Sequence, residues 1–318
     1  MPLFGKRASQ TDATNGTAAS ATSSAANTAS AANTAGGYDL RLPDVALHYV
    51  TWGQRTTPER AVILVHGLTA SHKEFATLGP ALAEQGWYVV ALDLRGRGLS
   101  SKPAHGYGIM YHAADVLALC DTLNLDSVNV VGHSLGAIIG MYLAAIAPQR
   151  IRTLTMIDAG GKIPDDTAQA ISASVSRLGT VYPSLDAYLG LMRQLPMLQW
   201  NDLWEEYFRY DADVRPDGTV ASRVPKAAIE EESLALALTR SEALPDLVKC
   251  PTLVVRATVG LLGPNAGFIL PRDEADRLCS VIADCRLIEV PNTNHYTVVL
   301  ADETISGIKD FLAQHAAG

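Results

Sequence analysis

The stretch GHSLG at residues 132–136 has the residue types and spacing of a nucleophilic serine site. It follows the Val-rich run Val128–Val131 and precedes the helix-forming run Ala137–Leu143. In a G-x-S-x-G nucleophile elbow, the serine lies on a tight turn between a strand and a helix, with its hydroxyl exposed above the sheet. The backbone N–H of Leu135 would then point at a developing oxyanion. The motif predicts nucleophilic catalysis by Ser134, and a plain Gly/Ser turn remains the alternative on these residues alone.

Alternating strand and helix patterns surround this motif. Ala61–Val65 is apolar throughout, which is typical of a strand buried on both faces of a parallel sheet. Pro43-Asp44 predicts a turn that joins two short strands into a hairpin. The predicted strands are residues 38–42, 46–52, 61–65, 87–92, 128–132, 153–157, 252–256 and 286–290, and the predicted helices include residues 75–85, 110–123, 272–282 and 301–316. This alternation predicts an α/β fold with a mostly parallel sheet covered on both faces.

Two segments do not follow the alternation. Residues 161–244 are mostly helical in character and rich in Trp, Tyr, Phe and Met, so we expect a helical cap inserted at the carboxyl edge of the sheet, where ligands bind in such folds. The core would then comprise residues 38–160 and 245–318. Residues 1–37 contain a run of Ala, Thr, Ser, Asn and Gly that has too little apolar surface to fold, and we expect a disordered low-complexity tail.

From about residue 45 to the C-terminus, the sequence resembles the α/β-hydrolase superfamily. Four motifs stand in the family's order: VILVHG at 62–67, DLRGRGLS at 93–100, GHSLG at 132–136 and NHY at 294–296. The resemblance implies the α/β-hydrolase fold, a doubly wound and mostly parallel sheet with a helical cap. It also implies roles for single residues. Ser134 would be the nucleophile, His295 the general base, and the N–H groups of Leu68 and Leu135 the oxyanion hole.

Other motif residues are expected to have structural roles. His66 and His133 adjoin motif positions, and we interpret both as hydrogen-bonding residues rather than catalysts. Arg95 and Arg97 are expected to brace the loop after Asp93.

The family's catalytic triad also contains an acid that orients the histidine. Its commonest position is after the strand that follows the cap, and this chain departs from that pattern. Gly267 occupies the aligned position here, and no Asp or Glu occurs between residues 256 and 271. Certain haloalkane dehalogenases and some lactone and amide hydrolases place the acid after the strand that follows the elbow helix, where this chain has Asp158. We therefore predict that Asp158 orients His295. Asp273, Glu274 and a dyad without an acid remain alternatives.

The expected reaction is acyl transfer to water on a small, largely apolar carboxylic ester, lactone or amide, with no metal or organic cofactor. A serine nucleophile argues against dehalogenase or epoxide hydrolase chemistry, for which this family uses aspartate. Hydrolysis of a carbon–carbon bond in a diketone-like ring-cleavage product remains an alternative. So does a receptor-like protein that binds its ligand with little turnover.

The cap aromatics and the apolar loop 259–262 suggest the substrate pocket. The candidate pocket residues are His133, Trp204, Leu261, Leu262 and Tyr296. The cap aromatics could equally form the core of the cap. Cationic cap residues could meet a substrate carboxylate or lie on the solvated surface, namely Arg193, Arg209, Arg223 and Lys226.

Composition limits the partners. The chain has 318 residues, 48% of them apolar, and a formal net charge of −8, which disfavours nucleic acid as a partner. No apolar run approaches the roughly 20 residues of a membrane span, so we expect a small-molecule substrate, no membrane partner and a monomer or homodimer. The four cysteines are scattered without zinc-site spacing. Cys279 and Cys285 could approach each other, but nothing demands a disulfide, and we expect a reducing, cytoplasmic location.

Overall fold

The structure, a computed structural model, describes residues 36–239 and 241–316. Most of the tail predicted for residues 1–37 therefore lies outside the described residues. Gly36 and Gly37 are exceptions, because they begin the first strand and are not part of a disordered tail. None of the helices among the described residues is both long and apolar enough to cross a membrane.

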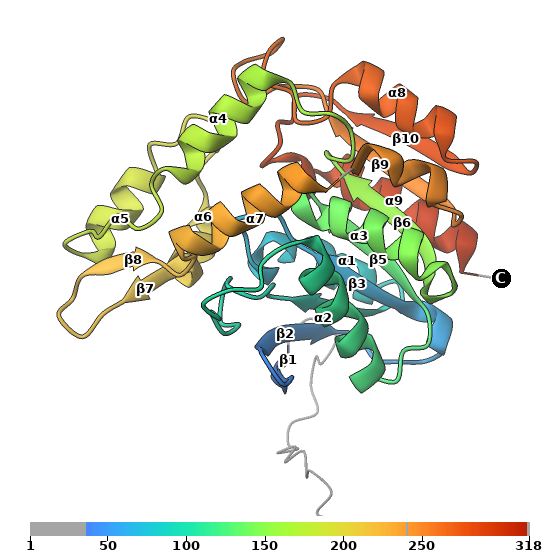
Figure 1. Cartoon of the computed structure of the whole chain (residues 1–318), viewed down its shortest axis with the longest axis horizontal. Helices are drawn as coiled ribbons and strands as arrows, with labels where there is room; N and C mark the ends of the chain where they lie inside the picture. The colour runs from blue at the N-terminus through green and yellow to red at the C-terminus, as the bar shows by residue number, and fades with distance from the viewer. Residues whose placement is uncertain (1–35, 240, 317–318) are drawn as a thin grey trace, which may run out of the picture. The chain divides into compact units, whose positions relative to one another are not determined.

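The central sheet of the described chain has eight strands in the order β1-β2-β4-β3-β5-β6-β9-β10 (Figure 1). The β1–β2 and β2–β4 pairs are antiparallel, and the remaining pairs are parallel. The strands are β1 Gly36–Arg41, β2 Ala46–Trp52, β3 Ala61–Val65, β4 Tyr88–Leu92, β5 Val128–His133, β6 Ile151–Ile157, β9 Thr252–Ala257 and β10 Cys285–Val290. The prediction of a mostly parallel sheet that begins with a hairpin is confirmed.

Alternation of side chains along the buried strands separates two cores. In β3, Ile63 and Val65 contribute to one apolar cluster, whereas Val62 and Leu64 contribute to the other. Helices α2, α3 and α8 pack on the first cluster, and α1 and α9 on the second. These helices are α1 Leu78–Ala83, α2 Ile109–Thr122, α3 Leu135–Ile146, α8 Arg272–Val281 and α9 Asp302–His315. Successive residues of a strand face opposite sides, so a wholly apolar strand requires helices on both faces.

The helix predicted for residues 75–85 is shorter in the structure. A 3₁₀ turn, η2 (His72–Phe75), comes first, and α1 begins only at Leu78. Pro80 explains the late start, because a proline deep inside a helix clashes with the carbonyl of the preceding turn and is tolerated only near the N-terminus. The remaining 3₁₀ turns are η1 Pro58–Arg60, η3 Pro148–Arg150, η4 Ser241–Ala243, η5 Pro245–Leu247 and η6 Val298–Leu300.

The segment between β6 and β9 is mostly helical, as its composition predicts (Figure 1). We call residues 161–244 the cap segment. It contains α4 Asp165–Val175, α5 Leu185–Met192, α6 Asp202–Asp211 and α7 Lys226–Leu238, together with a two-stranded sheet of β7 Ala212–Val214 and β8 Val220–Ser222. The sequence analysis did not predict this hairpin, whose strands are too short to give an alternating pattern.

Cys279 of α8 and Cys285 of β10 form a disulfide. The sequence left this pairing open. Cys120 is a free, buried thiol, as expected for a core cysteine.

A buried ion pair connects the cap segment to the core. Glu232 of α7 is fully buried and accepts hydrogen bonds from Arg97 Nη2, at 3.0 Å, and from His112 Nε2. Arg97 Nε also donates to the carbonyl oxygen of Leu68 at 2.9 Å. One guanidinium therefore contacts both α7 and the loop after β3. This geometry agrees with the bracing role expected for Arg97 and adds a contact with the cap.

We expect the Glu232→Ala substitution to lower the free energy of unfolding by about 3–5 kcal/mol, because it leaves the buried Arg97 charge without its carboxylate. Urea denaturation measures this change. Glu230→Ala on the same helix is the matched control, since Glu230 forms an exposed pair with Lys226 at 3.6 Å. Loss of that pair should cost less than about 1 kcal/mol. Equal effects of the two substitutions would contradict the prediction.

Candidate active site

Ser134 lies on a strained turn between β5 and α3. Its φ of +54° falls in the left-handed region, and its N–H donates to the carbonyl of Ile157 at 3.0 Å. The turn is tight because three backbone segments meet there. A Cβ atom on Gly136 would lie 1.9 Å from the carbonyl oxygen of Val65, and one on Gly132 would lie 2.1 Å from that of Gly136. Only glycine fits at these two positions, which explains the G-x-S-x-G spacing.

A continuous hydrogen-bond chain joins Ser134, His295 and Asp158. His295 Nε2 lies 3.0 Å from Ser134 Oγ, and His295 Nδ1 lies 2.9 Å from Asp158 Oδ2. The other carboxylate oxygen of Asp158 accepts a hydrogen bond from the N–H of Ala257 at 3.0 Å. An ionised carboxylate only accepts hydrogen bonds, so the proton of the neutral imidazole is on Nδ1. Nε2 is then free to accept the serine proton.

Sheet order explains why Asp158, far from His295 in sequence, contacts it. Strands β5, β6, β9 and β10 are consecutive neighbours and parallel, so the residues that follow β6 and β10, among them Asp158 and His295, emerge at the same edge of the sheet. The two other candidate acids do not contact His295 in the structure. Asp273 is exposed at the start of α8, and Glu274 accepts a hydrogen bond from Arg277. Gly267, at the aligned position of the commoner pattern, has no carboxylate to offer.

The environment of His295 favours its neutral form. Burial lowers the pKa of His295 below 6.5, and the positive charge of His133 lowers it further, while Asp158 acts in the opposite direction. A neutral imidazole at neutral pH is able to act as a general base.

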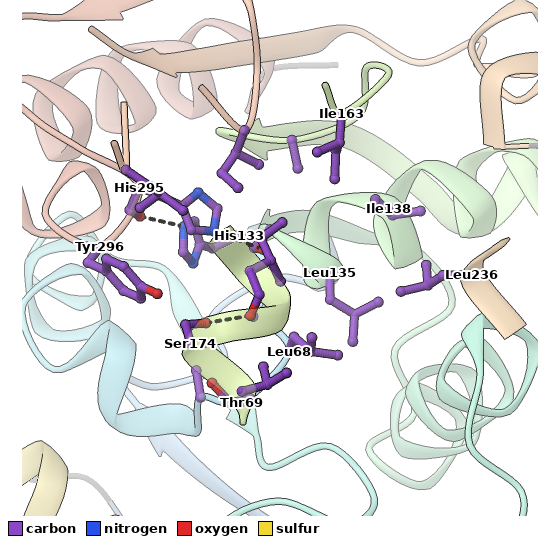
Figure 2. A pocket seen from close by; sticks show the side chains of 18 of the residues that line it. Leu68, Thr69, His133, Leu135, Ile138, Ile163, Ser174, Leu236, His295 and Tyr296 are labelled. Carbon is purple, nitrogen blue, oxygen red and sulfur yellow. Dashed lines mark hydrogen bonds between the residues drawn. The ribbon is translucent and has the colours of Figure 1, made fainter. Parts of the chain in front are cut away.

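The two residues predicted to form the oxyanion hole, Leu68 and Leu135, line the same cavity as Ser134. Leu135 is the first residue of α3, where helical N–H groups have no acceptor within the helix, and Leu68 follows Gly67 in the loop after β3. Both side chains line the cavity beside Ser134 (Figure 2). His66 fixes the base of this loop. Its Nδ1 donates to the carbonyl of Gly67 at 2.8 Å, and its Nε2 accepts from the N–H of Leu94 at 3.0 Å. Burial lowers the pKa of His66 to about 4, so its role is that of a neutral hydrogen-bonding residue.

An apolar cavity of about 420 Å³ opens over Ser134. Its floor comes from the core, and its walls come largely from α4 and α7 of the cap segment, including Ile171 and Val175. Figure 2 shows Leu236 of α7 in this wall. Of the predicted pocket residues, those that line the cavity are His133, Leu261 and Tyr296.

Two predicted pocket residues lie elsewhere. Trp204 is buried in the apolar core of the cap segment, where its ring contacts Tyr207 and Phe208. Leu262 is 54% exposed on a turn next to Gly263. Sequence type does not reveal which face of a helix or turn is directed toward a cavity, and in α6 it is Tyr207 that lines it.

The cavity wall contains no Lys or Arg among the described residues. The cationic cap residues form ion pairs: Arg193 and Arg209 with Glu205, Arg223 with Asp213 and Lys226 with Glu230. The cavity does contain one carboxylate, that of Glu74. Nothing in the sequence motifs singles out Glu74. The signal available was an acidic residue in η2, one turn beyond the loop that carries Leu68.

Among the described residues, His48, His72 and Asp93 are close enough together to bind a metal ion. The Asp93 carboxylate is already saturated. It accepts hydrogen bonds from the N–H and Nδ1 of His72, from the N–H of Leu99 and from the hydroxyl of Tyr210. We therefore interpret this cluster as a brace for the loop at residues 93–100.

Comparison with known proteins finds similarity to hydrolases. A family model described as "alpha/beta hydrolase fold" matches residues 60–198. The chain is 34% identical over 127 residues to the 3-hydroxybutyrate-oligomer hydrolase of Cupriavidus necator, a match that spans 39% of this chain and 43% of that protein. It is 28% identical over 259 residues to the 2-(acetamidomethylene)succinate hydrolase of Mesorhizobium japonicum, covering 79% of this chain and 87% of that protein.

The structural comparison concerns the fold. The crystal structure of an E-2-(acetamidomethylene)succinate hydrolase superposes with a TM-score of 0.77 at 22% sequence identity, over 88% of this chain and 100% of that one. The α/β-hydrolase fold implied by the sequence motifs is thereby confirmed.

We expect Gly136→Ala to destabilise the protein by about 3 kcal/mol or more, because its Cβ would overlap the Val65 carbonyl oxygen. Gly190→Ala in α5 is the control, since its Cβ would meet nothing within 4 Å and alanine favours a helix. That control should be neutral or stabilising by up to about 1 kcal/mol. Urea denaturation of both variants tests the expectation, which fails if Gly136→Ala is as stable as the native protein.

Proposed function

Because this chain belongs to the α/β-hydrolase superfamily, we propose that it is a serine hydrolase with Ser134 as nucleophile, His295 as general base and Asp158 as the orienting acid. Its substrate is a small, largely apolar carboxylic ester, lactone or amide. The observation that carries the proposal is the hydrogen-bond chain from Asp158 through His295 to Ser134 at the floor of an apolar cavity.

The reaction proceeds in two steps. His295 Nε2 accepts the hydroxyl proton as Ser134 Oγ attacks the substrate carbonyl, and the N–H groups of Leu68 and Leu135 stabilise the oxyanion. The protonated His295 then donates its proton to the leaving group, which leaves an acyl-enzyme. A water molecule, activated by the same imidazole, hydrolyses that ester. Asp158 keeps the proton on Nδ1 and stabilises the imidazolium.

The cavity supports an uncharged acyl group as substrate. A carboxylate transferred from water into an apolar cavity needs a cation or several hydrogen-bond donors to offset its lost hydration. The wall offers no Lys or Arg among the described residues, and the one carboxylate that lines it, Glu74, is paired with His133. The relative from Mesorhizobium japonicum is named for a substituted succinate. We propose that this chain shares the hydrolytic chemistry but takes neutral substrates.

A turnover screen of p-nitrophenyl esters, lactones and anilides tests the catalytic proposal. Ser134→Ala should lower kcat/KM by at least about 10³-fold, and Asp158→Asn by about 10²- to 10⁴-fold, because the second change favours the wrong imidazole tautomer. The melting temperatures of both variants should lie within a few degrees of that of the native protein.

The matched control is Asp273→Asn, which alters an exposed aspartate at the start of α8 and should change kcat/KM by less than about twofold. Full activity of Asp158→Asn together with loss of activity in Asp273→Asn would contradict the assignment of the acid. Stoichiometric binding of a carbonyl compound without turnover would contradict the enzymatic proposal.

Two esters of similar acyl length test the proposed charge preference. We expect kcat/KM for p-nitrophenyl butyrate to exceed that for p-nitrophenyl hemisuccinate by at least about 100-fold, because only the second buries a carboxylate in the apolar cavity. Rates of alkaline hydrolysis correct for the intrinsic reactivity of the two esters. A preference for the hemisuccinate would show that the cavity offsets the lost hydration of a carboxylate and would contradict the proposal.

A further inference from the structure

Glu74 and His133 form a buried ion pair beneath the cavity. Glu74 Oε1 lies 2.9 Å from His133 Nδ1, and the two side chains are 10% and 3% exposed. The proposed reaction makes no use of either group. Both nevertheless line the cavity floor, and His133 is the residue immediately before Ser134.

Geometry fixes the protonation state of His133. Its Nδ1 faces the Glu74 carboxylate, and its Nε2 lies 2.9 Å from the backbone carbonyl oxygen of His295. Neither partner is a donor when Glu74 is ionised, so both ring nitrogens must carry protons. Burial opposes this charge, but Glu74 outweighs burial and raises the pKa of His133 above 6.5. The pKa of Glu74 is correspondingly lowered by His133 in spite of burial.

The pair contacts all three segments that surround the serine hydroxyl. Glu74 Oε2 accepts a hydrogen bond from the N–H of Gly67 at 3.1 Å, one residue before Leu68. His133 belongs to β5 and leads into the elbow. Its Nε2–H donates to the backbone of His295, and Figure 2 shows His133 and His295 lying against each other. The Leu68 loop, the elbow and the His295 loop therefore meet at one ion pair.

We propose that Glu74 and His133 are positioning residues, an ion pair that holds the Leu68 N–H and the His295 imidazole at fixed places on either side of Ser134. This inference rests on the proposed function. Glu74 determines the position of the Leu68 loop through Gly67, and His133 determines the position of the base through its backbone.

The pair also has an electrostatic effect on the base. The rings of His133 and His295 are 4.6 Å apart between centroids, so a charged His133 opposes protonation of His295. The charged groups that face His295 are His133 from β5, Asp158 from the end of β6 and Glu74 from η2. His133 lowers the pKa of His295, whereas Asp158 and Glu74 raise it. Removal of the His133 charge should therefore raise the pKa of His295 and move the loss of reactivity on acidification to higher pH.

The rate at which a fluorophosphonate modifies Ser134, measured against pH, tests the proposal without a known substrate. His133→Gln retains an amide donor for the His295 carbonyl but removes the charge, and it should raise the midpoint of the acid limb by about one pH unit. Glu74→Gln removes the negative charge of Glu74, and His133 then loses its extra proton and its positive charge. Because the two charges act on His295 in opposite directions, this variant should shift the midpoint less than His133→Gln. His105→Gln, at a side chain that is 91% exposed, is the control and should leave the profile unchanged.

Rescue by the conservative variant tests the positioning role. Glu74→Ala should lower the maximal labelling rate about tenfold, because the Gly67 N–H loses its acceptor and the Leu68 donor moves. Glu74→Gln should stay within about threefold of the native rate, since its amide oxygen can accept that hydrogen bond. Equal rates for Glu74→Ala and Glu74→Gln, or an unshifted midpoint in folded His133→Gln, would overturn the proposal.

If the variants do not fold, a measurement on the native protein tests whether His133 is charged. In ¹⁵N-histidine NMR spectra, His133 should remain an imidazolium above pH 6.5, and a His133 that is neutral at this pH would overturn the ion pair. Failure of the proposed function gives a different result, because native Ser134 would then resist the fluorophosphonate while the NMR titration still reports on His133.

Discussion

The close approach of β3, β5 and the start of α3 is the constraint on which the active site depends. The Val65 carbonyl leaves no room for a side chain on Gly136. This crowding holds Ser134 at a φ of +54°, a conformation that costs on the order of 1–3 kcal/mol. The hydrogen bond from its N–H to Ile157 and the burial of β5 between β3 and β6 offset that strain. As a result, the serine hydroxyl projects from the sheet, and the first N–H groups of α3 face the same space.

Buried charges around the cavity are all held by partners beneath its surface. Asp93 accepts hydrogen bonds from its own loop and from Tyr210 of α6, and Arg97 joins Leu68 to Glu232 of α7. Buried ions need such partners to offset their lost hydration. Two cap helices are thus bound to the loops that follow β3 and β4. A shift of α6 or α7 would break a buried hydrogen bond, so the cap and the loops after β3 and β4 should move together or not at all.

Local patterns predicted much of the fold, because a strand buried on both faces and a glycine-bounded elbow leave marks within a few residues. The absence of an acid near Gly267 was likewise local, and it led to Asp158, whose Oδ2 lies 2.9 Å from His295 Nδ1. Contacts between residues that are far apart in the sequence do not produce a local sequence pattern. Glu74 contacts His133 across 59 residues, and Trp204 packs in the cap core with apolar residues of α5 and β8. Neither fact follows from spacing, and the role of Asp158 itself stays a proposal.

The floor and the wall of the cavity differ in how far the family model covers them. Ser134, Leu68, Leu135 and Asp158 all lie within residues 60–198, which match the family model. Part of the wall lies beyond that region, in α7 and in the loop around Leu261. Similarity over residues 60–198 therefore bears on how a carbonyl is attacked and much less on which acyl group fits. The wall has to be interpreted from its own chemistry, and that chemistry is apolar with a carboxylate and, among the described residues, no Lys or Arg. The proposed preference for a neutral substrate rests on the cost of desolvating an anion in such a cavity.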